Sequence, residues 1–139
     1  MARTDNFKNQ HVQILTIARD IKALLTSPDA AKHTVEVRQL LSQLSGKLSF
    51  HLAMEDKSLY PFMSSHADAH VKALSKQYSD EMGSLGQTFK AYLGKWSNAM
   101  LIDADLPGFV GETRDVINAL VRRIQREDTE LYPMVDKLS

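Results

Sequence analysis

An eleven-residue segment of the chain recurs 72 positions later. The first copy, residues 51–61, has the sequence HLAMEDKSLYP, and the second, residues 123–133, has the sequence RIQREDTELYP. Glu-Asp and Leu-Tyr-Pro are identical in the two copies, whereas His51 in the first is matched by Arg123 in the second. A single repeat of this length indicates two similar halves and not a stack of many short units. We therefore expect two helical hairpins related by a pseudo-twofold axis.

Apolar residues recur every three or four positions over four long segments, which is the pattern of amphipathic helices. Breaks fall near residues 26–29, 61–65 and 98–108, each of which contains proline. Strand-like alternation and glycine-rich phosphate loops are not found in the sequence. The pattern predicts an all-α fold, an up-down-up-down antiparallel four-helix bundle. The four helices are expected at about 6–26, 32–60, 67–98 and 109–137.

The apolar stripes of the second and fourth helices can be followed to their ends. In the second, Phe62 lies in register three positions after Leu59, but Pro61 is expected to loosen or end the helix there. In the fourth, the stripe ends with Leu131 and Met134.

Composition excludes several classes of function. The 139 residues include 17 acidic and 17 basic side chains, so we expect neither nucleic acid nor an anionic membrane surface as a partner. The absence of cysteine excludes disulfides, thiolate metal sites and cysteine nucleophiles. No apolar run is long enough for a membrane span, and the N-terminus lacks a signal-like apolar core. We expect one cytoplasmic domain, residues 1–139.

Polar residues interrupt the apolar stripes without breaking their helical spacing. His11 fills a gap in the first stripe, and His51 and Glu55 lie on the second. Glu127 lies on the fourth stripe, with Arg123 one turn before it. In an antiparallel bundle, residues equally far from a connecting turn lie at the same depth, within about one helical turn. This rule predicts one layer that contains His11, His51, Glu55, Tyr78, Met82, Arg123 and Glu127.

Burying carboxylates and imidazoles is costly unless they are paired or coordinate a metal. Two histidines and two glutamates in a bundle core form a ligand set for iron, manganese or zinc. The alternative is that each is a structural residue, hydrogen-bonded or reaching solvent on its own. A second, weaker candidate pair is His66 and His70, spaced four apart near the start of the third helix, where a plain polar helix entry is the alternative.

The residues that carry this pattern resemble the hemerythrin-like (HHE cation-binding) domain family. They are His11, the His51-x-x-x-Glu55 pair and the Leu-Tyr-Pro endings of the second and fourth helices. The resemblance covers nearly the whole chain and implies a four-helix bundle with a non-haem di-iron centre. Members of the family carry or sense oxygen, sense iron, or repair iron–sulfur clusters.

The sequence departs from the family pattern on the third and fourth helices. Met82 stands where the family has a histidine, Tyr78 where some members have a further ligand, and Arg123 where the second His-x-x-x-Glu/Asp pair begins. The remaining set resembles the ligands of one iron, with the two glutamates as bridges: His11, His51, Glu55 and Glu127. An alternative alignment would make His70 a ligand and Leu74 the substituted position.

We hypothesise that Arg123 replaces the second metal as the counter-charge of the two glutamates, since a guanidinium is always charged and can hydrogen-bond carboxylates. The alternative is that its side chain extends to solvent. In the first case, either one metal remains or ion pairs close a metal-free site.

The function implied is a hemerythrin-like protein whose second-iron ligands are lost. It would bind at most one non-haem iron per site, with zinc, manganese or no metal as alternatives, and act in metal or redox sensing, in storage, or as an interaction module. The alternative is a non-haem iron protein, mononuclear or di-iron, with a redox or oxygen-binding function. Whether the protein is an enzyme therefore stays open, and we lean towards the view that it is not. A protein partner or homo-oligomer also stays open. It would require an exposed apolar patch, for which Tyr92, Trp96 and Met100 are candidates, with ordinary core as the alternative.

Overall fold

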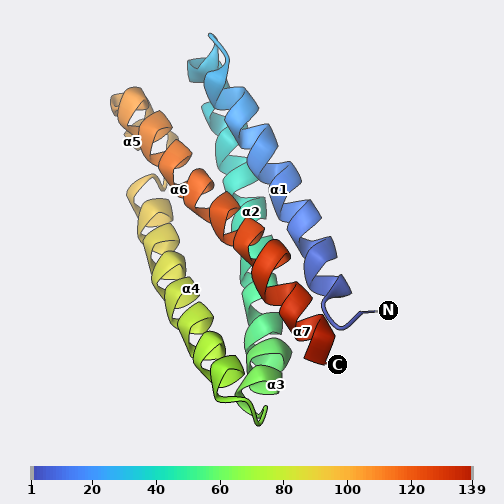
Figure 1. Ribbon diagram of the computed structural model, residues 1–139. Helices are drawn as coiled ribbons and strands as arrows, with labels where there is room; N and C mark the ends of the chain where they lie inside the picture. The colour runs from blue at the N-terminus through green and yellow to red at the C-terminus, as the bar shows by residue number, and fades with distance from the viewer. Residues whose placement is uncertain (1, 139) are drawn as a thin grey trace.

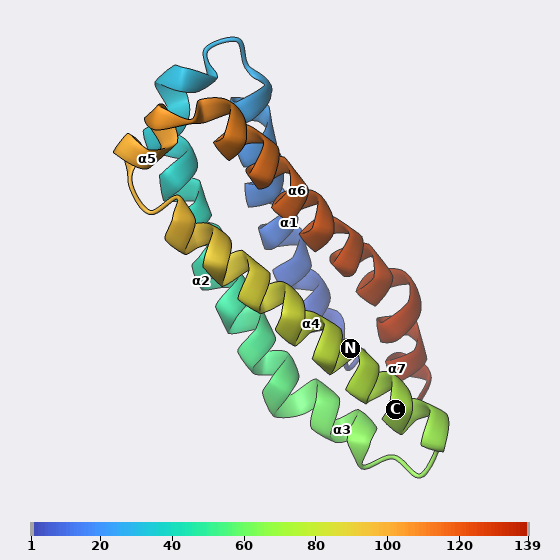
Figure 2. The same ribbon diagram turned by 90° about the vertical axis from the view of Figure 1, so that its left-hand side faces the viewer.

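The computed structural model describes residues 2–138 and shows four helical arms that run up, down, up and down (Figures 1 and 2). This confirms the predicted antiparallel bundle, and no strand occurs within the described residues. The first arm is α1 (Asp5–Thr26) and the third is α4 (Ala69–Lys95). Across residues 2–138, none of the helices combines the length and the apolar character needed to cross a membrane.

The second and fourth arms are each assembled from several helical pieces. The second comprises a 3₁₀ turn η1 (Ala30–His33), α2 (Thr34–Met54), a π-helical turn η2 (Glu55–Leu59) and α3 (Tyr60–Ser64). The fourth comprises α5 (Ala99–Ala104), α6 (Leu106–Arg126), a π-helical turn η3 (Glu127–Leu131) and α7 (Tyr132–Leu138). The sequence repeat therefore reappears as a repeated π turn.

Each π turn begins at the repeated glutamate and ends before the repeated tyrosine. The backbone N–H of Tyr60 donates to the carbonyl of Glu55, and that of Tyr132 donates to the carbonyl of Glu127, five residues back in both arms. A proline in an ordinary helix clashes with the carbonyl four residues earlier. The wider turn relieves this clash, so the helix loosens before Pro61, as one of the two predicted outcomes, but does not end there and continues to Ser64.

The extra residue in each π turn also shifts which side chains face the core. The stripes predicted Phe62 and Met134 as core residues, but both are only half-buried. Their neighbours Met63 and Val135 are fully buried instead. In both arms the buried residue lies one position after the predicted one, and the two positions are equivalent in the repeat. The reason is that the π turn inserts one residue into the helical spacing.

The predicted break at 98–108 is partly helical. Asn98 accepts a hydrogen bond from the N–H of Leu101 and starts α5, and Asp105 accepts one from the N–H of Gly108 and starts α6. Pro107 lies in the first turn of α6, where its fixed backbone suits a helix start. The fourth long helix therefore begins at Leu106, three residues before the predicted position.

Two apolar clusters fill the bundle on either side of a polar layer. One is centred on α1, α2 and the far ends of α4 and α6, and the other lies around α3 and α7. Tyr92 and Trp96 belong to the first cluster and are buried, so they do not form a surface patch. Met100 is exposed. Thr4 bonds Asp136 of α7 through both its amide and its hydroxyl group, which holds the start of α1 beside the end of the fourth arm (Figure 1).

A matched pair of glycine substitutions tests the local packing. No atom lies near the position of a Cβ at Gly83, so Gly83→Ala should raise the free energy of unfolding by about 0.5–1 kcal/mol through helix propensity. A Cβ at Gly108 would collide with the capping carboxylate of Asp105, so Gly108→Ala should lower the free energy of unfolding by up to about 1 kcal/mol. Urea denaturation shows whether each substitution raises or lowers the free energy of unfolding. A gain at both positions would contradict the Asp105 cap.

Candidate metal centre

Four buried polar side chains converge between the two apolar clusters. His11 comes from α1 and His51 from the last turn of α2, while Glu55 and Glu127 are the first residues of the two π turns. Their exposed fractions are 1%, 2%, 0% and 1%, respectively. The predicted layer is thus correct for these four residues.

The donor atoms lie close together. Nε2 of His11 is 3.1 Å from Nε2 of His51 and 2.8 Å from Oε1 of Glu127. Nε2 of His51 is 3.5 Å from the same oxygen and 3.4 Å from Oε1 of Glu55. Oε1 of Glu55 is buried without a hydrogen-bond partner among the described residues.

The outer nitrogens of both imidazoles are already occupied. Nδ1 of His11 lies 2.8 Å from a carboxylate oxygen of Asp128, and Nδ1 of His51 lies 2.6 Å from the amide oxygen of Gln10. Both acceptors require a proton on Nδ1. With Nδ1 engaged in this way, the Nε2 atom of each ring faces the centre of the cluster, where it donates to Glu127 when protonated and offers a lone pair when not.

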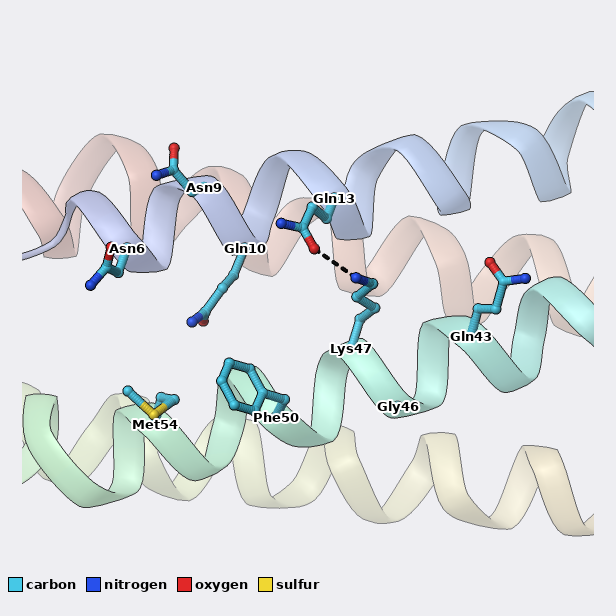
Figure 3. Close-up of a pocket in the computed structure, with 9 residues that line it drawn as sticks. All are labelled: Asn6, Asn9, Gln10, Gln13, Gln43, Gly46, Lys47, Phe50 and Met54. Atoms are coloured by element: carbon cyan, nitrogen blue, oxygen red, sulfur yellow. Dashed lines mark hydrogen bonds between the residues drawn. The ribbon is translucent and has the colours of Figure 1, made fainter.

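Gln10 reaches His51 from outside the bundle. Figure 3 shows Gln10 in a surface groove between α1 and α2, opposite Phe50 and beside the hydrogen bond of Gln13 and Lys47. The groove has a volume of about 720 Å³. It is lined mainly by amide side chains on the α1 side, and the residues are Asn6, Asn9, Gln10, Gln13, Gln43, Gly46, Lys47, Phe50 and Met54.

Tyr132 is a further member of the cluster that the sequence interpretation missed. Its hydroxyl donates to Oε2 of Glu55 at 2.8 Å and lies 3.2 Å from Oε1 of Glu127. It is also 3.2 Å from Nε2 of His11 and 3.5 Å from Nε2 of His51. The signal was present in the repeat, because Tyr132 belongs to the second Leu-Tyr-Pro.

The donor set fits a metal ion. Ligands held at about 2.1 Å from one ion lie roughly 3–4 Å apart. One donor atom each from His11, His51 and Glu127 lies within 4.8 Å of the others, so little movement would be needed. Two imidazole lone pairs that face each other repel unless a proton or cation lies between them, and the partnerless Oε1 of Glu55 adds a further acceptor.

Residues 2–135 of the chain match the family model of the hemerythrin HHE cation binding domain. The chain belongs to the hemerythrin family. No curated protein and no solved structure matches it. Both the family and the cluster of donor atoms therefore indicate metal binding.

Arg123 of this hemerythrin domain is buried, with an exposed fraction of 6%, so its side chain does not extend to solvent. Its Nε donates to Oε2 of Glu127 at 3.0 Å, and its Nη2 donates to the carbonyl of Tyr78 and to the hydroxyl of Tyr60. No hydrogen bond joins Arg123 to Glu55 among the described residues. The two tyrosines of the repeat thus have different partners. The hydroxyl of Tyr132 lies among the histidines and glutamates, whereas the hydroxyl of Tyr60 accepts from Arg123.

The other candidate residues lie outside the donor cluster. Tyr78 is buried with its ring beneath the guanidinium of Arg123, and Met82 belongs to the apolar core. His66 lies in the turn between α3 and α4, and His70 lies in the first turn of α4. There His66 accepts the N–H of Asp68, and Asp68 accepts the N–H of His70 as the cap of α4.

The charges of the centre are distributed unequally. Burial, followed by the charge of Glu127, raises the pKa of Glu55 well above its ordinary value. For Glu127, burial acts in the same direction, but hydrogen bonds from His11 and His51 and the charge of Arg123 outweigh it and lower the pKa. Burial lowers the pKa of His11, yet Glu127 and Asp128 outweigh it and raise the pKa. Without metal, Glu127 and Arg123 form the ion pair and Glu55 retains a proton.

The substitution Glu55→Gln tests this charge distribution in the metal-free hemerythrin domain. Because the pKa of Glu55 is raised by folding, its stabilising contribution is full below the ordinary glutamate pKa and is lost as pH rises through the raised value. Glutamine stays neutral, so the variant should match the wild type near pH 5 and exceed its free energy of unfolding by about 1–2 kcal/mol at alkaline pH. Urea denaturation in EDTA measures the difference. Glu36→Gln, an exposed change on α2, is the control, and a variant that weakens with rising pH relative to the wild type would contradict the assignment.

Proposed function

We propose that this hemerythrin domain binds a single non-haem metal ion through His11, His51, Glu55 and Glu127. The observation that carries the proposal is the convergence of two Nε2 atoms whose Nδ1 atoms are already bonded. Such an arrangement of donor atoms is suited to a cation, and without metal a proton on His11 takes its place. Binding of a divalent ion would replace the protons of His11 and Glu55, which conserves the total charge of the centre.

The position of Arg123 supports one metal and not two. Its guanidinium holds Oε2 of Glu127, the oxygen directed away from the histidine pair, and lies where the family pattern expects a histidine. A second cation beside this buried positive charge would be repelled. Arg123 therefore acts as the fixed counter-charge of Glu127, and reversible oxygen binding between two metals is not expected.

Iron is the metal we propose, because the chain belongs to the hemerythrin family and because imidazole and carboxylate ligands suit it. When bound, iron would supply a Lewis-acidic and one-electron redox centre. The chain's own residues would orient it: Asp128 and Gln10 hold the imidazoles, and Tyr132 holds Glu55. With the arginine half closed, we propose metal sensing or storage as the role.

Redox chemistry at the single metal is the second candidate function. It is favoured by the Tyr132 hydroxyl, which lies within 3.5 Å of all four proposed ligands and could give a proton to a bound molecule. Peroxide turnover by the iron-loaded protein distinguishes the two. Turnover that Tyr132→Phe abolishes with iron retained would favour redox chemistry over sensing or storage.

Elemental analysis together with the visible spectrum tests the proposal. The expected result is about one metal ion per chain, and no charge-transfer band of an oxo-bridged pair. Two irons per chain with such a band would exclude the single-metal site. A purified protein that takes up no iron, manganese or zinc after dialysis against each would exclude metal binding altogether.

A further inference from the structure

The groove between α4 and α6 contains a cluster of three arginines, of which Arg123 also contacts the metal centre, through Glu127. These two helices lie side by side along the bundle (Figure 2). The groove holds a pocket of about 270 Å³. Its lining consists of three arginines, one glutamate and two apolar residues, namely Arg122, Arg123, Arg126, Glu81, Leu85 and Ala119.

The arginines of this pocket are not fully satisfied by the chain. Nη1 of Arg123 is buried without a hydrogen-bond partner among the described residues, and its nearest carboxylate oxygen, from Glu81, is 3.7 Å away. The same oxygen of Glu81 accepts from Nη1 of Arg126 at 2.8 Å. Arg122 is exposed and has no ion pair with any residue of 2–138. The pocket lining therefore holds one carboxylate and three guanidinium groups.

The charges near the pocket are not shared evenly by its arginines. Glu81 pairs with Arg126, and Glu130, one turn after Arg126, adds a second negative charge close to it. Arg123 is paired with Glu127 through Nε, which leaves only its Nη1 without a partner, and Arg122 has no ion pair within residues 2–138. A buried guanidinium with a free N–H is costly to leave unpaired, and planar N–H groups match the oxygens of a tetrahedral anion.

We propose that this pocket binds a small tetrahedral oxyanion such as phosphate or sulfate. Arg122 and Arg126 hold the anion from the rim, and Nη1 of Arg123, which is covered in the unbound protein, donates to it from the floor once the Glu81 carboxylate moves aside. Glu81 is the competing internal anion, because its half-exposed carboxylate lies against the same two arginines, Arg123 and Arg126. The site shares no residue with the proposed metal ligands, although Arg123 also bonds Glu127, and it does not depend on a bound metal.

Calorimetric titration of the metal-free protein in EDTA with sodium sulfate tests the site, since sulfate keeps its double charge over the usable pH range. The expected result is one sulfate per chain. Binding should weaken by about tenfold or more in Arg122→Gln/Arg126→Gln, because charge-assisted hydrogen bonds are lost. Glu81→Gln should tighten binding severalfold by removing the competing carboxylate.

Arg114→Gln is the matched control, because it removes the same charge from an exposed position of α6 outside the pocket. It should leave the affinity unchanged. If circular dichroism shows that the double variant is unfolded, the exposed single change Arg122→Gln replaces it, with a smaller loss expected. Equal affinity in the Arg122 and Arg114 variants, or no binding of sulfate or inorganic phosphate, would overturn the proposal.

Discussion

Replacing His51 with alanine is expected to abolish binding of the metal ion. The variant removes one of the two Nε2 donors, and the remaining His11 is already 2.8 Å from Glu127, with which it would form a plain ion pair. Loss of one of four protein ligands typically lowers metal affinity by orders of magnitude, whereas loss of an outer hydrogen bond costs about 10–100-fold. Dialysis against iron, followed by elemental analysis, should give well under one ion per chain.

Two further variants make this result specific. His70→Ala removes an exposed histidine at the start of α4 and should leave the metal content unchanged. Gln10→Leu removes only the acceptor of Nδ1 of His51, so it should weaken binding without abolishing it. If His51→Ala kept a full metal ion while His70→Ala lost it, the proposed ligand set would be wrong.

The double change Met82→His/Arg123→His is expected to raise the metal content from about one to about two ions per chain. In the repeat, position 123 stands to Glu127 as His51 stands to Glu55, so a histidine there would restore the second His-x-x-x-Glu pair. Removal of the guanidinium also frees Oε2 of Glu127, its present partner, and removes the charge that repels a second cation.

The single change Arg123→Met is the control for this gain. It removes the charge without adding a ligand, so it should not raise the metal content, and it should destabilise the metal-free protein by about 3–5 kcal/mol because a buried ion pair is broken. Urea denaturation measures this loss. Unchanged stoichiometry in a folded double variant would contradict the placement of the second site at Met82 and Arg123.

The fold could be predicted from the sequence because the stripes of the first and third helices keep regular helical spacing along their whole length, even where His11 takes an apolar position. The errors lie where the second and fourth arms leave that spacing. A π turn changes the period for one turn only, so the stripes pointed to Phe62 and Met134 while the structure buries Met63 and Val135. Pro61 suggested a helix end for the same reason, since an ordinary helix cannot accommodate it as easily.

The candidate site could be predicted where its residues lie on a stripe. His11, His51, Glu55 and Glu127 all do so, and the structure brings them together. Tyr132 directly follows a stripe residue and was missed, because the π turn rotates it inwards. The pairing of Arg123 with Glu127 was expected and is found, whereas no hydrogen bond joins Arg123 to Glu55 among the described residues, and Tyr132 bonds Oε2 of Glu55 instead.

The buried guanidinium of Arg123 affects how the protein responds when the supply of metal changes. A metal ion leaves its site by dilution or chelation, whereas an arginine is part of the polypeptide. The Glu127 carboxylate therefore keeps a positive partner whether or not a metal ion is bound, and we expect the bundle to fold without the ion. Such a chain would persist in both the loaded and the unloaded form, so a partner could distinguish the two.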